Sequence, residues 1–297
     1  MNRVKFKESE LTECLGEDGY AVFDLLRDHD IEALTSIFNE NHSSNPEGFY
    51  ATTHLDDKEK RKTLSDQAMS ILACRIESHF ENIQLLGGAF ISKAPGEKGI
   101  LPLHQDWNLV DEKVARSYNM WIPLVDVNEE NGAMRILVGS HSKQETYRGP
   151  NVPPVLYPIS NEVDQHMVSL NMKKGEAVLY DHALWHSSPQ NQTNELRLAF
   201  VLGVVPQEAD LKYYQQNGDM VEEYASHPNF FFENDRESGP DGLELVRSFN
   251  HPNSFLSKEE FERVYLEKEE VRSVVSDEAK LKAEPKKGFF QRLFGTK

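Results

Sequence analysis

The feature that most constrains the fold is a series of short apolar segments between about residues 85 and 207. Each segment is rich in β-branched and aromatic residues, and turn sequences such as NEENG and MKKGE separate them. Segments of this length and spacing are typical of antiparallel strands in a β-sandwich or barrel. They are IQLLGGAFIS, SYNMWIPLVDV, AMRILV, HMVSLNM, EAVLY and LRLAFVLGVV. We therefore predict a mainly β core with flanking helices.

The first 84 residues have a helical rather than an alternating pattern. DHDIEALTSIFNE and SDQAMSILACRIESHF repeat apolar residues three and four positions apart, as amphipathic helices do. Asp28 is the expected N-cap of the first helix. We expect residues 1–84 to form helices that cover the β core.

Two regions follow the predicted core. Residues 208–275 are interpreted as a C-terminal extension, so that residues 1–275 form a single domain. Within it, LSKEEF contains a capping box of Ser257 and Glu260 that predicts a helix start. Residues 276–297 are a basic amphipathic tail. It is either a frayed end or, through residues 286–297, a docking segment for a partner or a membrane surface.

Charge and composition exclude several classes of function. The formal net charge of −17 does not favour binding to nucleic acid, which requires a basic face. No apolar run approaches the roughly 20 residues that span a bilayer. The opening sequence MNRVKFKESELTE lacks the apolar centre of a signal peptide, and Cys14 and Cys74 form no disulfide framework. We expect a cytoplasmic protein without a membrane span and without a nucleic-acid partner.

One of three His-x-acid pairs has the geometry of a metal site. The pairs are His54-x-Asp56, His79-x-Glu81 and His104-x-Asp106. The 11 histidines and 49 acidic residues among 297 predict about two such pairs by chance, so the motif alone carries little information. The first pair lies in the charged stretch HLDDKEKR, and the second lies on a helical pattern where residues two apart diverge. Only the third lies beside an expected strand, where alternate side chains share a face.

A facial triad of two histidines and one carboxylate needs a third ligand from a distant segment. LYDHALWHSSPQNQTNELRLAF supplies two candidates, His182 and His186. The same segment contains Arg197, which shares a strand face with small residues. A buried arginine requires an anion, and its planar guanidinium suits a carboxylate. A structural ion pair with a local glutamate is the alternative.

These blocks resemble the phytanoyl-CoA dioxygenase family. The resemblance rests on HQD, NGAMRILVGSHS and KKGEAVLYDHALWHSSPQNQTNELRLAF, and it spans roughly residues 87–205. It implies a double-stranded β-helix core of the jelly-roll, cupin-like type. It further implies an Fe(II)- and 2-oxoglutarate-dependent dioxygenase that hydroxylates an unactivated C–H bond of a small organic substrate. O2 is then the second co-substrate, and succinate and CO2 are the co-products.

The resemblance also implies roles for individual residues. His104, Asp106 and His186 correspond to the catalytic iron ligands, with His182 as the weaker candidate for the third position. The carboxylate of Asp106 favours hydroxylation, because halogenating relatives lack it. Gln105, between two ligands, is expected to point outward and to tolerate substitution.

Three further residues correspond to the 2-oxoglutarate pocket. Arg197 matches the residue that holds the distal carboxylate, and Ser188 and Trp121 match positions that line the same pocket. For Trp121, core packing is the alternative. The family sequence Pro-Gly-Ser-His reads VGSH here, and we expect His141 to be a structural donor rather than a ligand.

The substrate site is expected to involve the GFYATTH region around Tyr50 and His54, with the N-terminal helices and the loop 142–158 closing over the substrate. No basic cluster for the phosphates of coenzyme A is visible outside the tail, which argues against CoA esters. The rival interpretation is a metal-binding jelly roll without 2-oxoglutarate chemistry, either a cupin-like isomerase or an inactive scaffold.

Overall fold

The computed structural model describes residues 1–234, 239–251 and 254–267. The chain divides into two units, Met1–Leu256 and Ser257–Lys297. The predicted domain boundary at residue 275 and the tail at 276–297, with its docking segment 286–297, lie outside the described residues.

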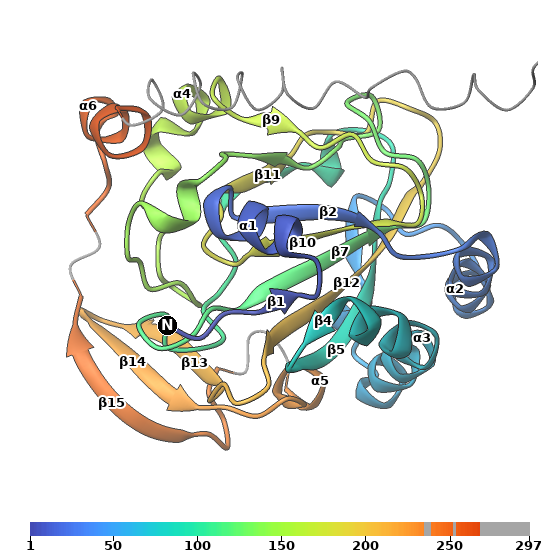
Figure 1. The fold of residues 1–297 in the computed structure, drawn as a ribbon, viewed down its shortest axis with the longest axis horizontal. Helices are drawn as coiled ribbons and strands as arrows, with labels where there is room; N and C mark the ends of the chain where they lie inside the picture. Colours follow the sequence, from blue (N-terminus) through green and yellow to red (C-terminus); the bar gives the residue numbers. More distant parts are fainter. Residues whose placement is uncertain (235–238, 252–253, 268–297) are drawn as a thin grey trace, which may run out of the picture. The chain divides into compact units, whose positions relative to one another are not determined.

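Two antiparallel sheets form the centre of the first unit (Figure 1). Within the described residues, the major sheet has the strand order β2-β10-β7-β12-β5-β3 and the minor sheet the order β6-β11-β8-β9. The major strands are β2 (Tyr20–Asp24), β10 (Glu176–Asp181), β7 (Tyr118–Pro123), β12 (Arg197–Pro206), β5 (Ile83–Lys93) and β3 (Phe49–Ala51). The minor strands are β6 (Leu101–His104), β11 (His186–Ser188), β8 (Arg135–Ile136) and β9 (Val168–Ser169). The prediction of a mainly β core is confirmed.

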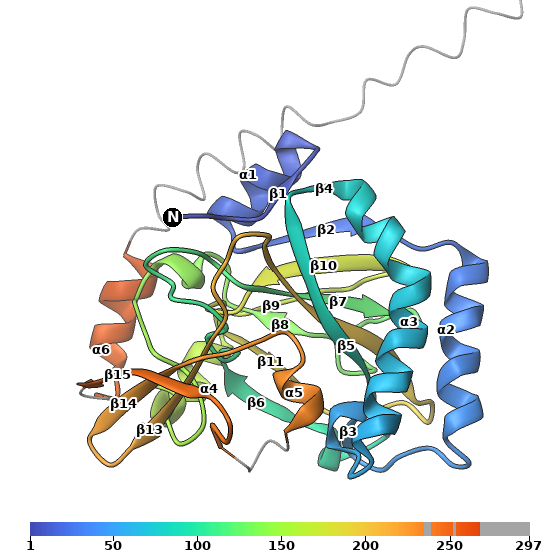
Figure 2. The ribbon, with the colours of Figure 1, turned by 90° about the horizontal axis from the view of Figure 1, so that it is seen from below.

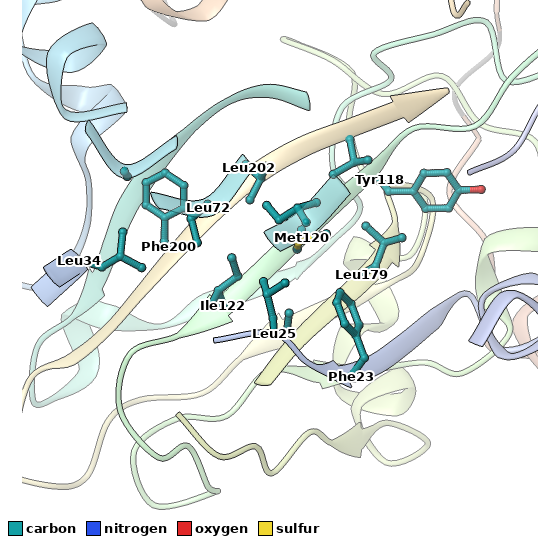
Figure 3. Close-up of a cluster of buried hydrophobic side chains, with 14 of the residues drawn as sticks. Phe23, Leu25, Leu34, Leu72, Tyr118, Met120, Ile122, Leu179, Phe200 and Leu202 are labelled. Atoms are coloured by element: carbon teal, nitrogen blue, oxygen red, sulfur yellow. The ribbon is translucent and has the colours of Figure 1, made fainter. Parts of the chain in front are cut away.

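Successive side chains of strand β12 belong to two different hydrophobic clusters, one on each face of the major sheet. Phe200 and Leu202 belong to a cluster on the outer face of the major sheet (Figure 3). Ala199 belongs to a second cluster, in which Trp121 of β7 packs with Ile136 of the minor sheet. Successive residues of a strand point to opposite faces, so one apolar strand serves both clusters.

Helices α2 (Asp28–Asn41) and α3 (Lys58–His79) lie side by side along the outer face of the major sheet (Figure 2). Leu34 of α2 and Leu72 of α3 are fully buried in the outer cluster (Figure 3). These helices cover the core as predicted. The further expectation that these helices close over the substrate is wrong. Their apolar sides pack against the face of the major sheet that points away from the minor sheet.

Helix α2 begins at Asp28, and its N-cap is Arg27 rather than Asp28. The carboxylate that supports the first turn belongs to Asp30, whose Oδ2 accepts a hydrogen bond from the Arg27 backbone N–H at 3.0 Å. Asp30 also pairs with Arg75 of α3 at 2.7 Å. The prediction of Asp28 as the N-cap is therefore wrong by one residue.

The N-terminal region contains strands as well as helices. Besides β2 and β3, it has β1 (Lys5–Phe6), which pairs with β4 (Phe80–Glu81), and helix α1 (Ser9–Glu17). Strand β2 pairs along its whole length with β10 and so forms an edge of the major sheet. The interpretation of residues 1–84 as mostly helical cover was incomplete, because the region also supplies these strands.

The region after the core contains a sheet of β13 (Lys212–Asn217), β14 (Met220–Ala225) and β15 (Glu244–Asn250). Helices α4 (Ser160–Asp164) and α5 (Phe230–Glu233) are short. In the second unit, α6 (Lys258–Phe261) continues as a π-helical turn, Glu262–Leu266. The predicted capping box of Ser257 and Glu260 is confirmed, with both reciprocal hydrogen bonds present.

Among the described residues, no helix combines the length and the apolar character needed to cross a bilayer. The cytoplasmic location stays a prediction.

Candidate metal centre

Strand pairing brings two of the predicted ligands together. His104 ends β6, and its register partner on the neighbouring strand β11 is His186. The centroids of the two imidazole rings are 4.2 Å apart. Side chains of directly opposed residues in an antiparallel pair lie on the same face, so the register alone places both rings together.

Asp106 completes the cluster from outside the strand. Strand β6 ends at His104, and Asp106 lies in the loop that follows. Its Oδ1 is 3.9 Å from Nε2 of His104, and its Oδ2 is 3.7 Å from Nε2 of His186. One ligand atom from each of the three residues lies within 4.8 Å of the other two. The predicted convergence is observed, although Asp106 reaches it from a loop.

Hydrogen bonds fix which nitrogen of each histidine faces the carboxylate. Nδ1 of His104 lies 2.7 Å from the Pro102 carbonyl, and Nδ1 of His186 lies 2.9 Å from the Leu184 carbonyl. A carbonyl oxygen only accepts, so each Nδ1 carries a hydrogen and each Nε2 is the nitrogen that faces the carboxylate. Imidazoles oriented in this way are typical of metal ligands.

The protonation states also suit a cation. Burial, followed by the repulsion of His104, lowers the pKa of His186 to about 4, so its ring is neutral at pH 7. Burial raises the pKa of Asp106, but attraction to His186 and the other nearby histidines, with a 2.8 Å hydrogen bond from Asn119, outweighs burial and holds that pKa well below its usual range. Two imidazoles and one carboxylate are the donor set of a facial triad, so the residues present fit Fe(II).

His182 and His141 lie outside this cluster. His182 is buried, its Nδ1 is 3.0 Å from Oγ of Ser117, and its carbonyl accepts the backbone N–H of Asp106. His141 is also buried, and its carbonyl accepts a hydrogen bond from Arg116. Neither belongs to the group of three that could hold a metal.

Arg197 lies near the cluster without an acidic partner. Its guanidinium carbon is 5.4 Å from the centroid of the Trp121 ring, and Nη1 donates to Oγ of Ser188 at 3.2 Å and to the carbonyl of Gly132. The side chain is buried, and within the described residues Nε has no hydrogen-bond partner and Arg197 has no ion pair. Burial lowers its pKa to about 10, which leaves it charged at neutral pH. An orphaned buried donor on a charged group fits an anionic ligand.

Lys93, which the sequence analysis missed, lies next to two residues of this site, Arg197 and Ser188. It is the register partner of Arg197 and is fully buried. Its Nζ lies 2.6 Å from Oγ and 2.9 Å from the carbonyl of Ser188, and 2.5 Å from the carbonyl of Pro189. Burial, followed by the repulsion of Arg197, lowers the pKa of Lys93 to about 6. The only signal in the sequence was its position at the end of the apolar segment IQLLGGAFISK. This signal is weak, because a lysine at a strand end is ordinarily exposed.

All six predicted site residues line one cavity of about 660 Å³. Its remaining walls are mainly apolar and include Phe49, Leu101, Trp107, Val152, Pro154 and Phe232. His54 also lines it, as predicted. Tyr50 does not: it packs against the outer-face cluster, and its hydroxyl is 2.8 Å from Nε2 of His42. The loop 142–158 contributes residues between Thr146 and Val155.

Gln105 does not point freely outward. Its Nε2 donates to the carbonyl of Ala183 at 2.5 Å, and its Oε1 accepts from the hydroxyl of Thr146 at 3.2 Å. The side chain therefore joins the segment between two ligands to two other loops. The expectation of an outward, unconstrained Gln105 is wrong.

Residues 17–199 match the family model described as phytanoyl-CoA dioxygenase (PhyH). Phytanoyl-CoA dioxygenase domain-containing protein 1 of Danio rerio is 28% identical over 157 residues, which cover 50% of this chain and 53% of that protein. The phytanoyl-CoA dioxygenase of Arabidopsis thaliana is 30% identical over 119 residues, which cover 39% and 42% of the two chains. The chain thus spans about half the length of the curated relatives that it matches.

Solved structures share the fold at low sequence identity. The non-haem α-ketoglutarate-dependent carbocyclase SnoK from nogalamycin biosynthesis has a TM-score of 0.52 and 18% identity, covering 71% of this chain and 89% of its own. The epimerase SnoN, in complex with Fe3+, α-ketoglutarate and nogalamycin RO, has a TM-score of 0.52 and 17% identity, covering 82% and 96%. The predicted jelly-roll fold is confirmed.

Proposed function

This chain belongs to the phytanoyl-CoA dioxygenase family, and we propose that it is an Fe(II)- and 2-oxoglutarate-dependent dioxygenase that hydroxylates an unactivated C–H bond of a small organic substrate. Succinate and CO2 are the co-products. One observation carries the proposal: the metal-binding group of His104, Asp106 and His186 lies on the same cavity as Arg197, a buried cation with an unused donor.

His104, Asp106 and His186 are the proposed metal ligands. Bound Fe(II) supplies the redox chemistry that couples O2 and 2-oxoglutarate to oxidation of the substrate, and three protein ligands leave coordination positions open for this. The chain's part is to hold two Nε2 lone pairs and one anionic carboxylate in place. The carbonyls of Pro102 and Leu184 do this for the histidines by accepting hydrogen bonds from their Nδ1–H groups.

Arg197, Lys93 and Ser188 form the proposed receptor for the distal carboxylate of 2-oxoglutarate. Oγ of Ser188 accepts hydrogen bonds from both basic side chains, so the three polar groups meet at one point. The ring of Trp121 lies against the guanidinium, which is buried. The alternative of a local glutamate partner for Arg197 finds no support among the described ion pairs.

The cavity favours an uncharged, largely apolar substrate. Its cations away from the co-substrate end already have acidic partners: Arg148 pairs with Glu112, and Lys212 lies 3.7 Å from Glu223. Among the described lining residues, no group of unpaired cations is available for several phosphates. This supports the expectation that CoA esters are not substrates.

The proposal is tested with anaerobically purified protein, to which Fe(II), 2-oxoglutarate and O2 are added while succinate is measured. We expect slow succinate formation that His104→Ala and His186→Ala abolish. His29→Ala, a change at an exposed histidine of α2, is the matched control and should leave it unchanged. No succinate from the unaltered protein, or full activity in His104→Ala, would contradict the proposal.

The oxidative outcome needs its own measurement, because the structurally similar proteins include a carbocyclase and an epimerase. Hydroxylation adds one oxygen atom to the substrate, and mass spectrometry with ¹⁸O2 detects it. A protein that binds the metal but neither binds nor consumes 2-oxoglutarate would instead favour the rival metal-binding jelly roll.

A further inference from the structure

We propose that Arg148 is a positioning residue for Asp106, and that its guanidinium sets the affinity of the site for a divalent cation. The inference deepens the proposed function and rests on its metal centre. It concerns the protein's own hydrogen bonds, so it is testable by metal binding alone.

Asp106 lacks the support that a strand would give it. Strand β6 stops at His104, so the backbone groups of Asp106 have no ladder partner. Its N–H instead donates to the carbonyl of His182 at 3.0 Å. Its carbonyl accepts from Nε of Arg148 at 2.7 Å. These two bonds fix the peptide planes on either side of the ligand, and one of them depends on a single side chain.

Arg148 also holds the residues around Asp106 through its backbone. Its N–H donates to Oδ1 of Asn108 at 2.5 Å, and its carbonyl accepts the N–H of Asn108 at 3.2 Å. Thr146 donates to Gln105 on the other side of the ligand. The segment 105–108 is therefore bound at several points to the first part of the loop 142–158.

The guanidinium of Arg148 is itself held rigidly by Glu112. Nη1 donates to Oε2 at 3.1 Å, and Nη2 donates to Oε1. Arg116 donates to the same carboxylate at 3.3 Å and grips Asp181 at 2.6 and 2.8 Å. All four side chains are less than 10% exposed, and their two positive and two negative charges balance.

This cluster links the loop that carries Asp106 to the turn that precedes His186. Asp181 accepts the N–H of Ala183 at 2.8 Å and so shapes the turn that leads into His186. Arg148 fixes Asp106 on the other side. A planar guanidinium is needed here, because Nε must point to Asp106 while both Nη groups grip Glu112. A lysine ammonium keeps the charge but lacks this fork.

The experiment measures Co(II) binding to the metal-free protein by titration, with absorption spectroscopy as the readout. The variants are Arg148→Met, Arg148→Lys and the double variant Arg148→Met/Glu112→Gln. Circular dichroism and thermal midpoints verify that each one is folded. The matched control is Arg75→Met, which also leaves a buried carboxylate, Asp30, without its arginine but lies on the helices of the outer face.

We expect the Arg148 variants to bind Co(II) about 10- to 100-fold more weakly, the range found when outer partners of metal ligands are removed. The loss should persist in the double variant, in which Glu112 no longer carries an uncompensated charge, while Arg75→Met binds as the unaltered protein does. Unchanged affinity in folded Arg148→Met, or affinity restored in the double variant, would overturn the inference. Failure of the unaltered protein to bind Co(II) would instead refute the proposed metal centre.

Discussion

Binding of 2-oxoglutarate to this protein should take up a proton at neutral pH, and the group responsible should be Lys93. Without a ligand, this lysine is fully buried beside Arg197, and its pKa is lowered to about 6. A carboxylate placed beside it favours the charged form, so binding raises this pKa. Lys93 is then neutral before binding and protonated afterwards.

The number of protons taken up on binding follows from the difference between the pH and the pKa of Lys93. At about pH 7.5 only about 3% of a lysine with a pKa near 6 is protonated, so uptake approaches one proton per ligand. If only the protonated form binds, affinity falls about tenfold, or about 1.4 kcal/mol, for each pH unit above the free pKa, until the bound pKa is reached. Below that free pKa the lysine is already charged, and this pH dependence disappears.

Calorimetric titration measures this uptake directly. The protein, loaded with Co(II), is titrated with 2-oxoglutarate in two buffers of different ionisation enthalpy, and the difference in observed heat gives the number of protons. We expect about one proton near pH 7.5 and almost none near pH 5. Lys93→Met should abolish the uptake and weaken binding. Lys212→Met, a change at a lysine that lines the same cavity but is partnered by Glu223, should keep both. No proton uptake by the unaltered protein near pH 7.5 would refute the reasoning.

Three further predictions concern the ligands, the anion receptor and the core. His186→Ala should lose Co(II) binding, whereas His182→Ala should retain it, as measured by Co(II) absorption; the opposite result would exchange their assignments. Arg197→Met should weaken 2-oxoglutarate binding about 10- to 100-fold in calorimetry, since a hydrogen bond to a charged group contributes about 1.5–3 kcal/mol, while Co(II) affinity is unchanged. Phe200→Ala should lower the free energy of unfolding by about 3–5 kcal/mol in urea titrations, because its fully buried ring leaves a cavity between the major sheet and α3. A loss below about 1 kcal/mol would mean that this ring is not tightly packed.

Local patterns were sufficient to predict which way the side chains of a single strand point. The alternation in LRLAFVL correctly separates the outward Phe200 from the inward Arg197 and Ala199. The spacing of His104 and Asp106 indicated convergence, and the structure brings both together with His186, although Asp106 lies in the loop after the strand. Period and spacing are properties of a single segment, so the sequence displays them directly.

Features that depend on which strands pair could not be read in this way. Lys93 acquires its importance from its register partner Arg197, about 100 positions away. The amphipathic pattern of α2 shows that it covers a surface but not which face of the sheet it covers. Arg148 lies in a proline-rich loop, and its role arises from Glu112 and Asp106, which pair with it only in the folded chain.

The pairing of His104 with His186 also has a consequence for how the protein folds. These two residues are roughly 80 positions apart, and closing a loop of that length costs entropy before any contact within it is gained. The segments between them include β7 and β10 of the major sheet and β8 and β9 of the minor sheet. Such non-local pairing is slow to form. A nascent chain in which β11 has not yet been made therefore lacks His186, one of the three proposed metal ligands.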